Sequence, residues 1–218
     1  MPFTSLLKSM DFLAPLTAPI FVAAGMPMST GDVLGFVTGV ICVWMTARAN
    51  IWNFPIGIAN ALILGLVFLQ QRLFADASLQ IVFIVLSCMG WWEWLTKRQT
   101  SEAAPVFASS MREQAVLASI AAVITLLLWQ VLIRLKGACP PVDALIMALS
   151  LCAQWQLNRR QISNWAWWIA VDVISIPLYW YRGLPLIAAL YVIFLIICVC
   201  GWRNWRPLRR SALAEAGA

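Results

Sequence analysis

The chain has 218 residues, of which 62% are hydrophobic and only 11% are charged, and its formal net charge is +6. A soluble globular domain carries about 25% charged residues, so this composition excludes a water-soluble fold and indicates an integral membrane protein. The chain contains no histidine, the commonest metal ligand and the usual proton carrier at neutral pH. We therefore expect no metal site, no catalytic residue and no cofactor. The surplus positive charge lies mostly beside predicted helix ends, so we expect no nucleic-acid partner.

The first 30 residues are predicted to form an interfacial segment. The stretch 3–28 contains one lysine, the acidic Asp11 and three prolines that interrupt its apolar character. This pattern differs from that of a cleaved signal peptide, so we expect the segment to stay attached.

Seven apolar stretches follow, each long enough for a transmembrane helix, which needs about 20 mostly apolar residues. In chain order, the predicted spans are 31–48, 52–70, 78–96, 115–135, 142–158, 164–181 and 184–203. An odd number of spans places the two ends of the chain on opposite sides of the membrane. The lysines and arginines divide ten to five between the two sides. The positive-inside rule then predicts a cytoplasmic C-terminus and an external N-terminus.

The chain also contains an internal repeat. The third and seventh spans end in the same Gly-Trp-x-x-Trp pattern, at residues 90–94 and 201–205, which are 111 residues apart. One residue more brings Trp52 onto Asn164 and Asn60 onto Asp172. Tryptophans recur at membrane interfaces in general, which is an alternative explanation of the first match, but the polar positions match as well.

The repeat predicts an all-α architecture of seven transmembrane helices arranged 3+1+3. The fourth helix restores a parallel relation between the two three-helix units, and parallel repeats enclosing a site at midplane are typical of transporters. The predicted regions are an interfacial segment at 1–30, the first repeat at 31–96, a linker with the fourth helix at 97–141, the second repeat at 142–205 and a cytoplasmic tail at 206–218.

Asp172 lies in the middle of the sixth span. A charge at that depth costs roughly 2.5 to 3.5 kcal/mol on insertion scales, so such a residue usually faces a partner, a ligand or water. At about 100° per residue, one face of this helix carries Asn164, Trp168, Asp172, Ser175 and Tyr179. Trp167, beside Trp168, also lies deep enough to stack on a ligand. We predict that this face forms half of a binding site for a small, flat, polar molecule.

The first repeat supplies four further candidates. Trp52, Asn53 and Asn60 belong to the second span, and Gln80 begins the third. Amides buried in lipid must find hydrogen-bond partners, either on another helix or on a ligand. Gln80 has the further alternative of contact with lipid headgroups. Because the repeat aligns the second span with the sixth, we favour a ligand. Indole faces bind flat π systems and cations, while amides and a carboxylate suit hydroxyls and positive charge. An aromatic heterocycle carrying a sugar or another polar arm satisfies both.

Several of these runs resemble the PnuC-type vitamin transporters over about residues 31–205. They are Trp52-Asn53-Phe54-Pro55, Asp76-Ala77-Ser78-Leu79-Gln80, the pattern at 90–94, Asn164-Trp165-Ala166-Trp167-Trp168 and Asp172-Val173-Ile174-Ser175. The resemblance implies a fold similar to that of the SWEET sugar transporters, a homo-oligomer, in that family a trimer, and a place in the bacterial inner membrane. It implies uptake of nicotinamide riboside by facilitated diffusion, with trapping by a cytoplasmic kinase.

By the same resemblance, Asn164 and Trp168 hold the nicotinamide end, with Trp52, Asn53 and Gln80 in the same pocket. Some riboside transporters have an amide at the position of Asp172, so thiamine and riboflavin remain alternative substrates.

Two other classes are weighed against a transporter. A membrane enzyme needs clustered nucleophiles, acids or metal ligands, whereas Asp172 and Glu93 lie far apart along the chain without a histidine to assist. No lysine follows a glycine, so the chain has no Walker A loop. We therefore do not expect an enzyme. A non-transporting membrane subunit of a larger importer remains the other alternative.

Overall fold

The computed structural model describes residues 14–70, 74–98, 106–135 and 139–216. The N-terminal half of the predicted interfacial segment and parts of the predicted linker therefore lie outside the described residues. The elements in chain order are α2 (Ala14–Thr17), β1 (Pro19–Ala23), β2 (Met26–Ser29), α3 (Thr30–Ala47), α4 (Asn53–Gln70), α5 (Phe74–Arg98), α6 (Met111–Arg134), α7 (Pro140–Asn158), α8 (Asn164–Tyr181) and α9 (Pro185–Ala216).

The described part of the chain is mainly helical, with one antiparallel hairpin, β1–β2, and an isolated β-bridge between Phe107 and Gln161, neither of which the all-α prediction included. Each predicted span falls on a helix, and most ends agree within a few residues. The exception is α9, which continues through most of the predicted tail. Within the described residues, five helices, α3, α4, α5, α6 and α9, are long and apolar enough to cross a membrane. The chain is thus a multi-pass α-helical membrane protein.

Local signals account for several helix starts. Ser29 and Asp32 form a capping box at α3: Ser29 Oγ accepts from the Asp32 backbone N–H at 3.2 Å, and Asp32 Oδ2 accepts from the Ser29 N–H at 2.9 Å. Ser110 caps α6 by accepting from the Glu113 N–H at 3.1 Å. Prolines open α7, where a missing N–H costs nothing.

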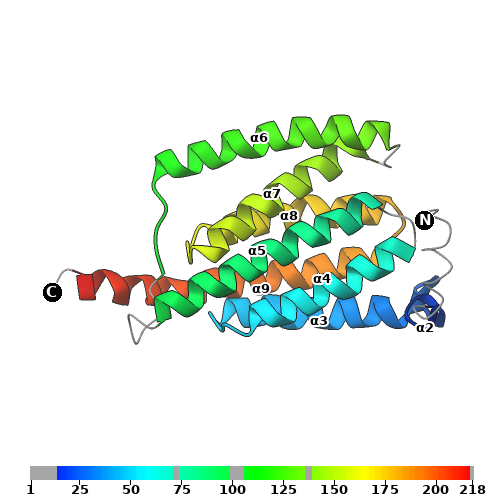
Figure 1. Cartoon of the computed structure of the whole chain (residues 1–218), viewed down its shortest axis with the longest axis horizontal. Helices are drawn as coiled ribbons and strands as arrows, with labels where there is room; N and C mark the ends of the chain where they lie inside the picture. Colours follow the sequence, from blue (N-terminus) through cyan, green and yellow to red (C-terminus); the bar gives the residue numbers. More distant parts are fainter. Residues whose placement is uncertain (1–13, 71–73, 99–105, 136–138, 217–218) are drawn as a thin grey trace, which may run out of the picture.

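The long helices form two neighbouring groups. In one, α4 packs against α3 and α5; in the other, α8 packs against α7 and α9. The groups meet where α3 contacts α9 and where α5 contacts α7, while α6 packs on the outer side of α7 (Figure 1). The helix α2 and the C-terminal end of α9 lie at opposite ends of the bundle (Figure 1).

Two tryptophans 111 residues apart make matching contacts between the groups. Trp94 of α5 donates its indole N–H to the Asn158 carbonyl of α7 at 3.0 Å. Trp205 of α9 donates to the Thr46 carbonyl of α3 at 3.2 Å. Both rings are buried, with exposed fractions of 1% and 0%. These members of the Gly-Trp-x-x-Trp pattern therefore face the interior and bond the two groups of helices to each other.

The same two rings have matching aromatic neighbours. Phe54 meets Trp94 edge-on with centroids 5.1 Å apart, and Trp165 meets Trp205 edge-on at 5.4 Å. A Cβ placed on Gly201 would come within 2.5 Å of the Trp165 ring. The glycine of the pattern is therefore needed for this close approach.

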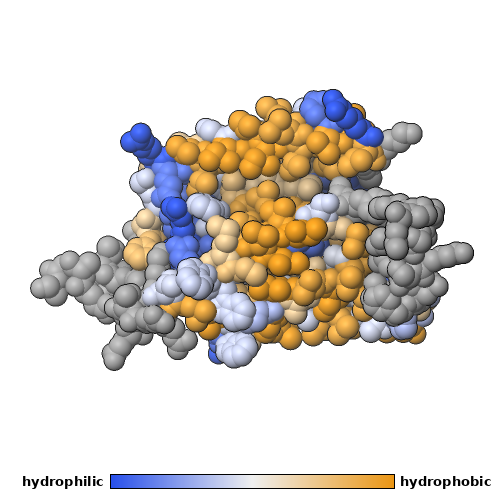
Figure 2. Space-filling view, viewed as in Figure 1, coloured by the Kyte–Doolittle hydropathy of each residue, from blue (hydrophilic) through white to orange (hydrophobic). Residues whose placement is uncertain are grey.

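The outer surface is suited to lipid. Figure 2 shows a hydrophobic band across the middle of the molecule, with hydrophilic residues gathered toward the two ends of the helices. Large apolar side chains such as Ile81 and Leu127 are more than half exposed. Such a continuous apolar surface is unstable in water and is expected of a protein that faces a bilayer.

Candidate functional site

The buried polar face of α8 is the centre of the candidate site. Asn164, Asp172 and Ser175 have exposed fractions of 0%, 2% and 0%. Trp168 lies on the same face and packs against the core cluster that contains Trp165. We call Asn164, Trp168, Asp172 and Ser175 the α8 stripe. Since α8 packs against both α7 and α9, the stripe points into the protein, with Asn164, Asp172 and Ser175 buried and Trp168 partly buried.

The α8 stripe has unused hydrogen-bonding capacity. Within the described part of the chain, Asn164 Oδ1, Asp172 Oδ2 and Ser175 Oγ are buried without a hydrogen-bond partner. A buried polar atom without a partner costs about 1–3 kcal/mol, so three along one face call for an explanation. All three atoms can accept a hydrogen bond. They suit a molecule that brings hydroxyl or amide donors into this part of the bundle.

Asp172 faces α9, where its neighbours are Cys198 and Tyr191. Tyr191 stacks on Tyr179 of α8 with ring centroids 5.2 Å apart, and Phe194 meets Tyr191 edge-on at 5.9 Å. Among the residues that the structure describes, no lysine or arginine forms an ion pair with Asp172. A buried carboxylate beside aromatic rings and without a counter-charge suits a flat, positively charged group.

Asn60 joins α4 to α3 near this aromatic group. Its amide nitrogen donates to the Gly35 carbonyl at 2.7 Å and to Thr38 Oγ1 at 2.8 Å. A Cβ on Gly39 would lie 3.6 Å from that nitrogen and 3.5 Å from the Phe194 ring. Asn60 thus lies beside the contact between α3 and α9, and its nitrogen is already used between helices.

Gln80 lies against α4, where a Cβ on Gly65 would be 3.5 Å from its own Cβ. The side chain therefore faces the first group of helices.

Asn53 and Asn164 make equivalent local contacts. Asn53 Nδ2 donates to the Asn50 carbonyl at 2.7 Å, and Asn164 Nδ2 donates to the Gln161 carbonyl at 2.6 Å. Each amide thus ties the start of its helix to the preceding turn. Asn53, and not Trp52, makes the contact equivalent to that of Asn164. Trp52 is 62% exposed, so in this conformation it lies outside the protein interior.

Trp167 points away from the α8 stripe. Its indole N–H donates to Gln114 Oε1 of α6 at 2.7 Å, and its ring packs on the cluster between α6 and α7 that contains Leu117. Neighbouring positions on a helix point about 100° apart, so Trp167 and Trp168 face different partners. The structure brings Trp168 together with Asn164 and Asp172, but it does not bring Trp167 there.

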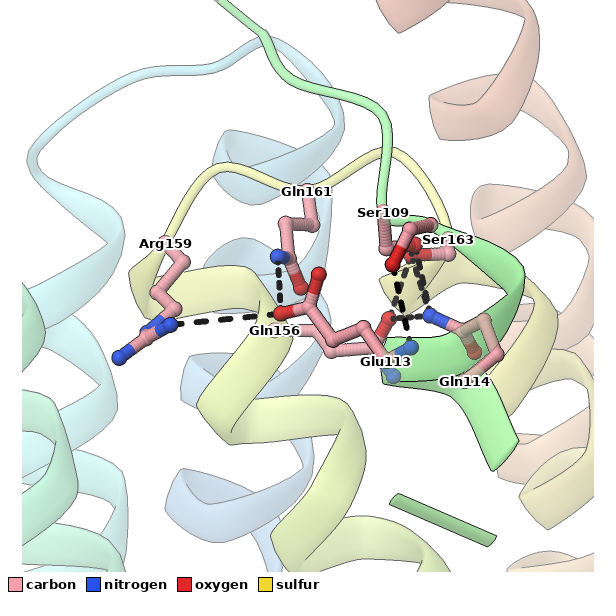
Figure 3. A network of polar contacts seen from close by, with 8 residues as sticks. Ser109, Glu113, Gln114, Gln156, Arg159, Gln161 and Ser163 are labelled. Atoms are coloured by element: carbon pink, nitrogen blue, oxygen red, sulfur yellow. Dashed lines mark hydrogen bonds and ion pairs between the residues drawn. The ribbon is translucent and has the colours of Figure 1, made fainter. Parts of the chain in front are cut away.

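A polar network around Gln114 was not predicted from the sequence. It joins the start of α6, the end of α7 and the turn into α8 (Figure 3), through Ser109, Glu113, Gln114, Gln156, Arg159, Gln161 and Ser163. Gln156 is fully buried within the predicted fifth span. Asp172 was predicted as a site residue because it is a polar side chain deep in an apolar stretch. Gln156 meets the same criterion, so this one residue of the network was predictable from the sequence.

An ion pair closes the other end of α8. Arg182 lies 2.7 Å from Asp143 Oδ2 at the start of α7. Burial lowers the pKa of Arg182, but the hydrogen bond and negative charge of Asp143 outweigh this effect and raise that pKa above its usual value. The α8 helix is therefore tied to α7 at its far end as well.

The chain matches a family model described as "Nicotinamide mononucleotide transporter" over residues 29–207. It is 24% identical to the nicotinamide riboside transporter PnuC of Escherichia coli, over 90% of this chain and 94% of that protein. It is 27% identical to the riboflavin/roseoflavin transporter RibM of Streptomyces davaonensis, over 93% of this chain and 98% of that protein.

A solved structure shares the fold. The crystal structure of the vitamin B3 transporter PnuC superposes with a TM-score of 0.70 at 22% identity, covering 96% of this chain and 90% of that chain. The relatives are transporters, which agrees with the expectation that the protein is not an enzyme. Since the family model spans most of the sequence, the chain belongs to the nicotinamide mononucleotide transporter family and is a membrane transporter of the PnuC type.

Proposed function

We propose that this transporter imports nicotinamide riboside by facilitated diffusion. The observation that carries the proposal is the α8 stripe, which combines an aromatic ring, a buried carboxylate without a counter-charge and unpaired buried acceptors. Nicotinamide riboside offers a flat pyridinium, an amide and ribose hydroxyls, which complement these groups one by one.

In the proposed complex, Asn164 and Trp168 hold the nicotinamide end. Asp172 balances the pyridinium charge, and Ser175 accepts from a ribose hydroxyl. Asn53, Asn60 and Gln80 would line the same pocket from the first group of helices, whereas Trp52, which is exposed, and Trp167, which bonds to Gln114, lie outside the stripe. The free Oδ1 of Asn164 suits the substrate's amide N–H.

The proposed transport cycle uses two three-helix units, α3–α5 and α7–α9, as parallel repeats with α6 as the linker. The reciprocal contacts of α3 with α9 and of α5 with α7 support this 3+1+3 arrangement of seven spans, as do the matching bonds of Trp94 and Trp205. Rocking of one unit against the other would expose the site to each side in turn. We place the C-terminus in the bacterial cytoplasm, where a kinase would phosphorylate the imported riboside. We further propose a homotrimer.

A second candidate is riboflavin, which appears as the substrate in the name of the RibM relative. That relative covers almost the whole chain at an identity comparable with that of the PnuC relatives. Riboflavin is uncharged, so it would leave Asp172 without a counter-charge. The carboxylate therefore favours the cationic substrate.

The test is a binding and uptake panel with the purified full-length protein. Nicotinamide riboside, thiamine and riboflavin are each titrated, and uptake is then measured in liposomes without an energy source. We expect tightest binding of nicotinamide riboside and its equilibration across the liposome membrane. Preferred binding of riboflavin would replace the substrate assignment, and binding without uptake would indicate a non-transporting subunit.

A further inference from the structure

The amide of Gln114 is fully engaged at the junction of α6, α7 and α8. Its nitrogen donates to Ser109 Oγ at 2.6 Å, to Gln156 Oε1 at 2.9 Å and to Ser163 Oγ at 3.2 Å. Its oxygen accepts from the Trp167 indole N–H at 2.7 Å. We call these five residues the α6 latch. Figure 3 shows Gln114 pointing from α6 toward Ser109, Ser163 and Gln156.

The serines and Gln156 bond to one another as well as to Gln114. The two hydroxyls of Ser109 and Ser163 lie 2.6 Å apart, and Ser163 donates to Gln156 Oε1. Removing the Gln114 side chain would therefore break the bond of the Trp167 indole N–H, while the two serines and Gln156 would keep their bonds to one another.

The first turn of α8 is bonded to α6 through its N-cap residue. Ser163 occupies the N-cap position, but its side chain makes no capping bond to α8. Its hydroxyl instead bonds to Ser109, Gln114 and Gln156. Ser163 and Trp167 thus hold the first turn of α8 from its outer side. Asn164 and Trp168, the next residue after each, face inward.

The chain before α6 is bonded to the same turn by its backbone. The Phe107 N–H donates to the Arg160 carbonyl at 3.0 Å, and the Ile162 N–H donates to the Phe107 carbonyl at 3.0 Å. Gln161 adds a side-chain bond to Glu113 Oε1 at 2.7 Å. The beginning of α6 is therefore attached to the α7–α8 turn at several points, and α6 packs mainly on α7.

We propose that Gln114 is a positioning residue for the substrate site: through Trp167 and Ser163 it fixes the rotation of the first turn of α8, and so aims Asn164 and Trp168 inward. This inference rests on the proposed function, because it concerns substrate affinity at the same site.

The test is a double-mutant cycle on substrate binding. We compare Gln114→Met, Trp167→Phe and the double variant with the parent protein, using the full-length chain and radiolabelled nicotinamide riboside. Methionine keeps the length of glutamine without its bonds, and phenylalanine keeps a ring without the indole N–H. Gln130→Ala, at an exposed position on the same helix, is the matched control. Thermal melting without substrate is recorded for each variant.

We expect each single variant to weaken binding roughly three- to tenfold, the range that corresponds to one lost hydrogen bond. The affinity of the double variant should equal that of the single variant with the lower affinity, because both changes break the same contact. Gln130→Ala should bind like the parent. Gln114→Glu keeps an acceptor for Trp167 but loses the amide donor, so its affinity should lie between those of Gln114→Met and the parent. A role in stability alone predicts lower melting temperatures with unchanged affinity.

Unchanged affinity in both single variants would overturn the inference. Additive losses would also overturn it, since they would mean that Gln114 does not act through Trp167. Failure of the parent protein to bind any of the three vitamins would instead contradict the proposed function.

Discussion

Replacing Asp172 by asparagine tests most directly whether its carboxylate attracts a positively charged substrate. The two side chains have nearly the same shape, so the substitution removes the charge and leaves the packing beside Cys198 and Tyr191 in place. We expect the variant to lose affinity for nicotinamide riboside while its affinity for riboflavin changes little. Its melting temperature without substrate should rise, because a buried charge without a partner is removed.

The size of the loss follows from the burial of the carboxylate. Two unit charges 4 Å apart attract by about 1 kcal/mol in water and by about 4 kcal/mol at an effective dielectric constant near 20. Asp172 is 2% exposed and pairs with no described basic residue, so a bound cation should approach the larger figure. Desolvation of the cation offsets part of the gain. We therefore expect a net loss of about 2 kcal/mol, or roughly 30-fold in affinity.

The assay is equilibrium binding of both vitamins to the parent and to the variant in the same detergent and salt. Asp76→Asn, the same chemical change at an exposed position on α5, is the control for general electrostatic effects. An equal loss for nicotinamide riboside and riboflavin would refute the reasoning, because it would show that Asp172 acts through shape or hydrogen bonding. An unchanged affinity for both would place the substrate elsewhere.

Three further outcomes are expected. Asn164→Ala and Trp168→Ala should abolish detectable binding of nicotinamide riboside while membrane insertion, measured by extraction and size-exclusion profile, stays normal; binding equal to that of the parent would remove these residues from the site. Gly201→Ala should lower the free energy of unfolding by about 1–3 kcal/mol, because its Cβ would come within 2.5 Å of the Trp165 ring. Thermal melting measures this loss of stability. Gly65→Ala is the matched control: its new Cβ would have its nearest neighbour 3.5 Å away, so the variant should melt close to the parent protein. Gln114→Met should weaken binding of nicotinamide riboside roughly three- to tenfold, whereas the control Gln130→Ala should bind like the parent.

The positions of the helices could be predicted from the sequence because the signal is local. Apolar runs of sufficient length, with capping residues such as Ser29 at their ends, fix where a helix begins and ends in lipid. The buried face of α8 was also predictable, since a carboxylate and an asparagine in an apolar stretch must point away from lipid. Asn164, Asp172 and Ser175 are indeed buried together.

The roles of the tryptophans could not be predicted in this way. Indole rings suit a membrane interface, a ligand and a packed core equally well, and the sequence gives no means of separating these environments. The structure assigns Trp94 and Trp205 to the core, leaves Trp52 exposed and turns Trp167 toward α6. The α6 latch was missed for a related reason, since its members come from three separate segments of the chain.

The sequence by itself therefore determined that this protein is a helical membrane protein with one inward polar face, because hydropathy and helical periodicity act over neighbouring residues. Only the tertiary structure decided which helices surround that face and which polar side chains are already bonded to one another. Contacts such as Gln114 with Trp167 join residues 53 positions apart. They depend on how the helices are rotated and packed, which no local pattern specifies.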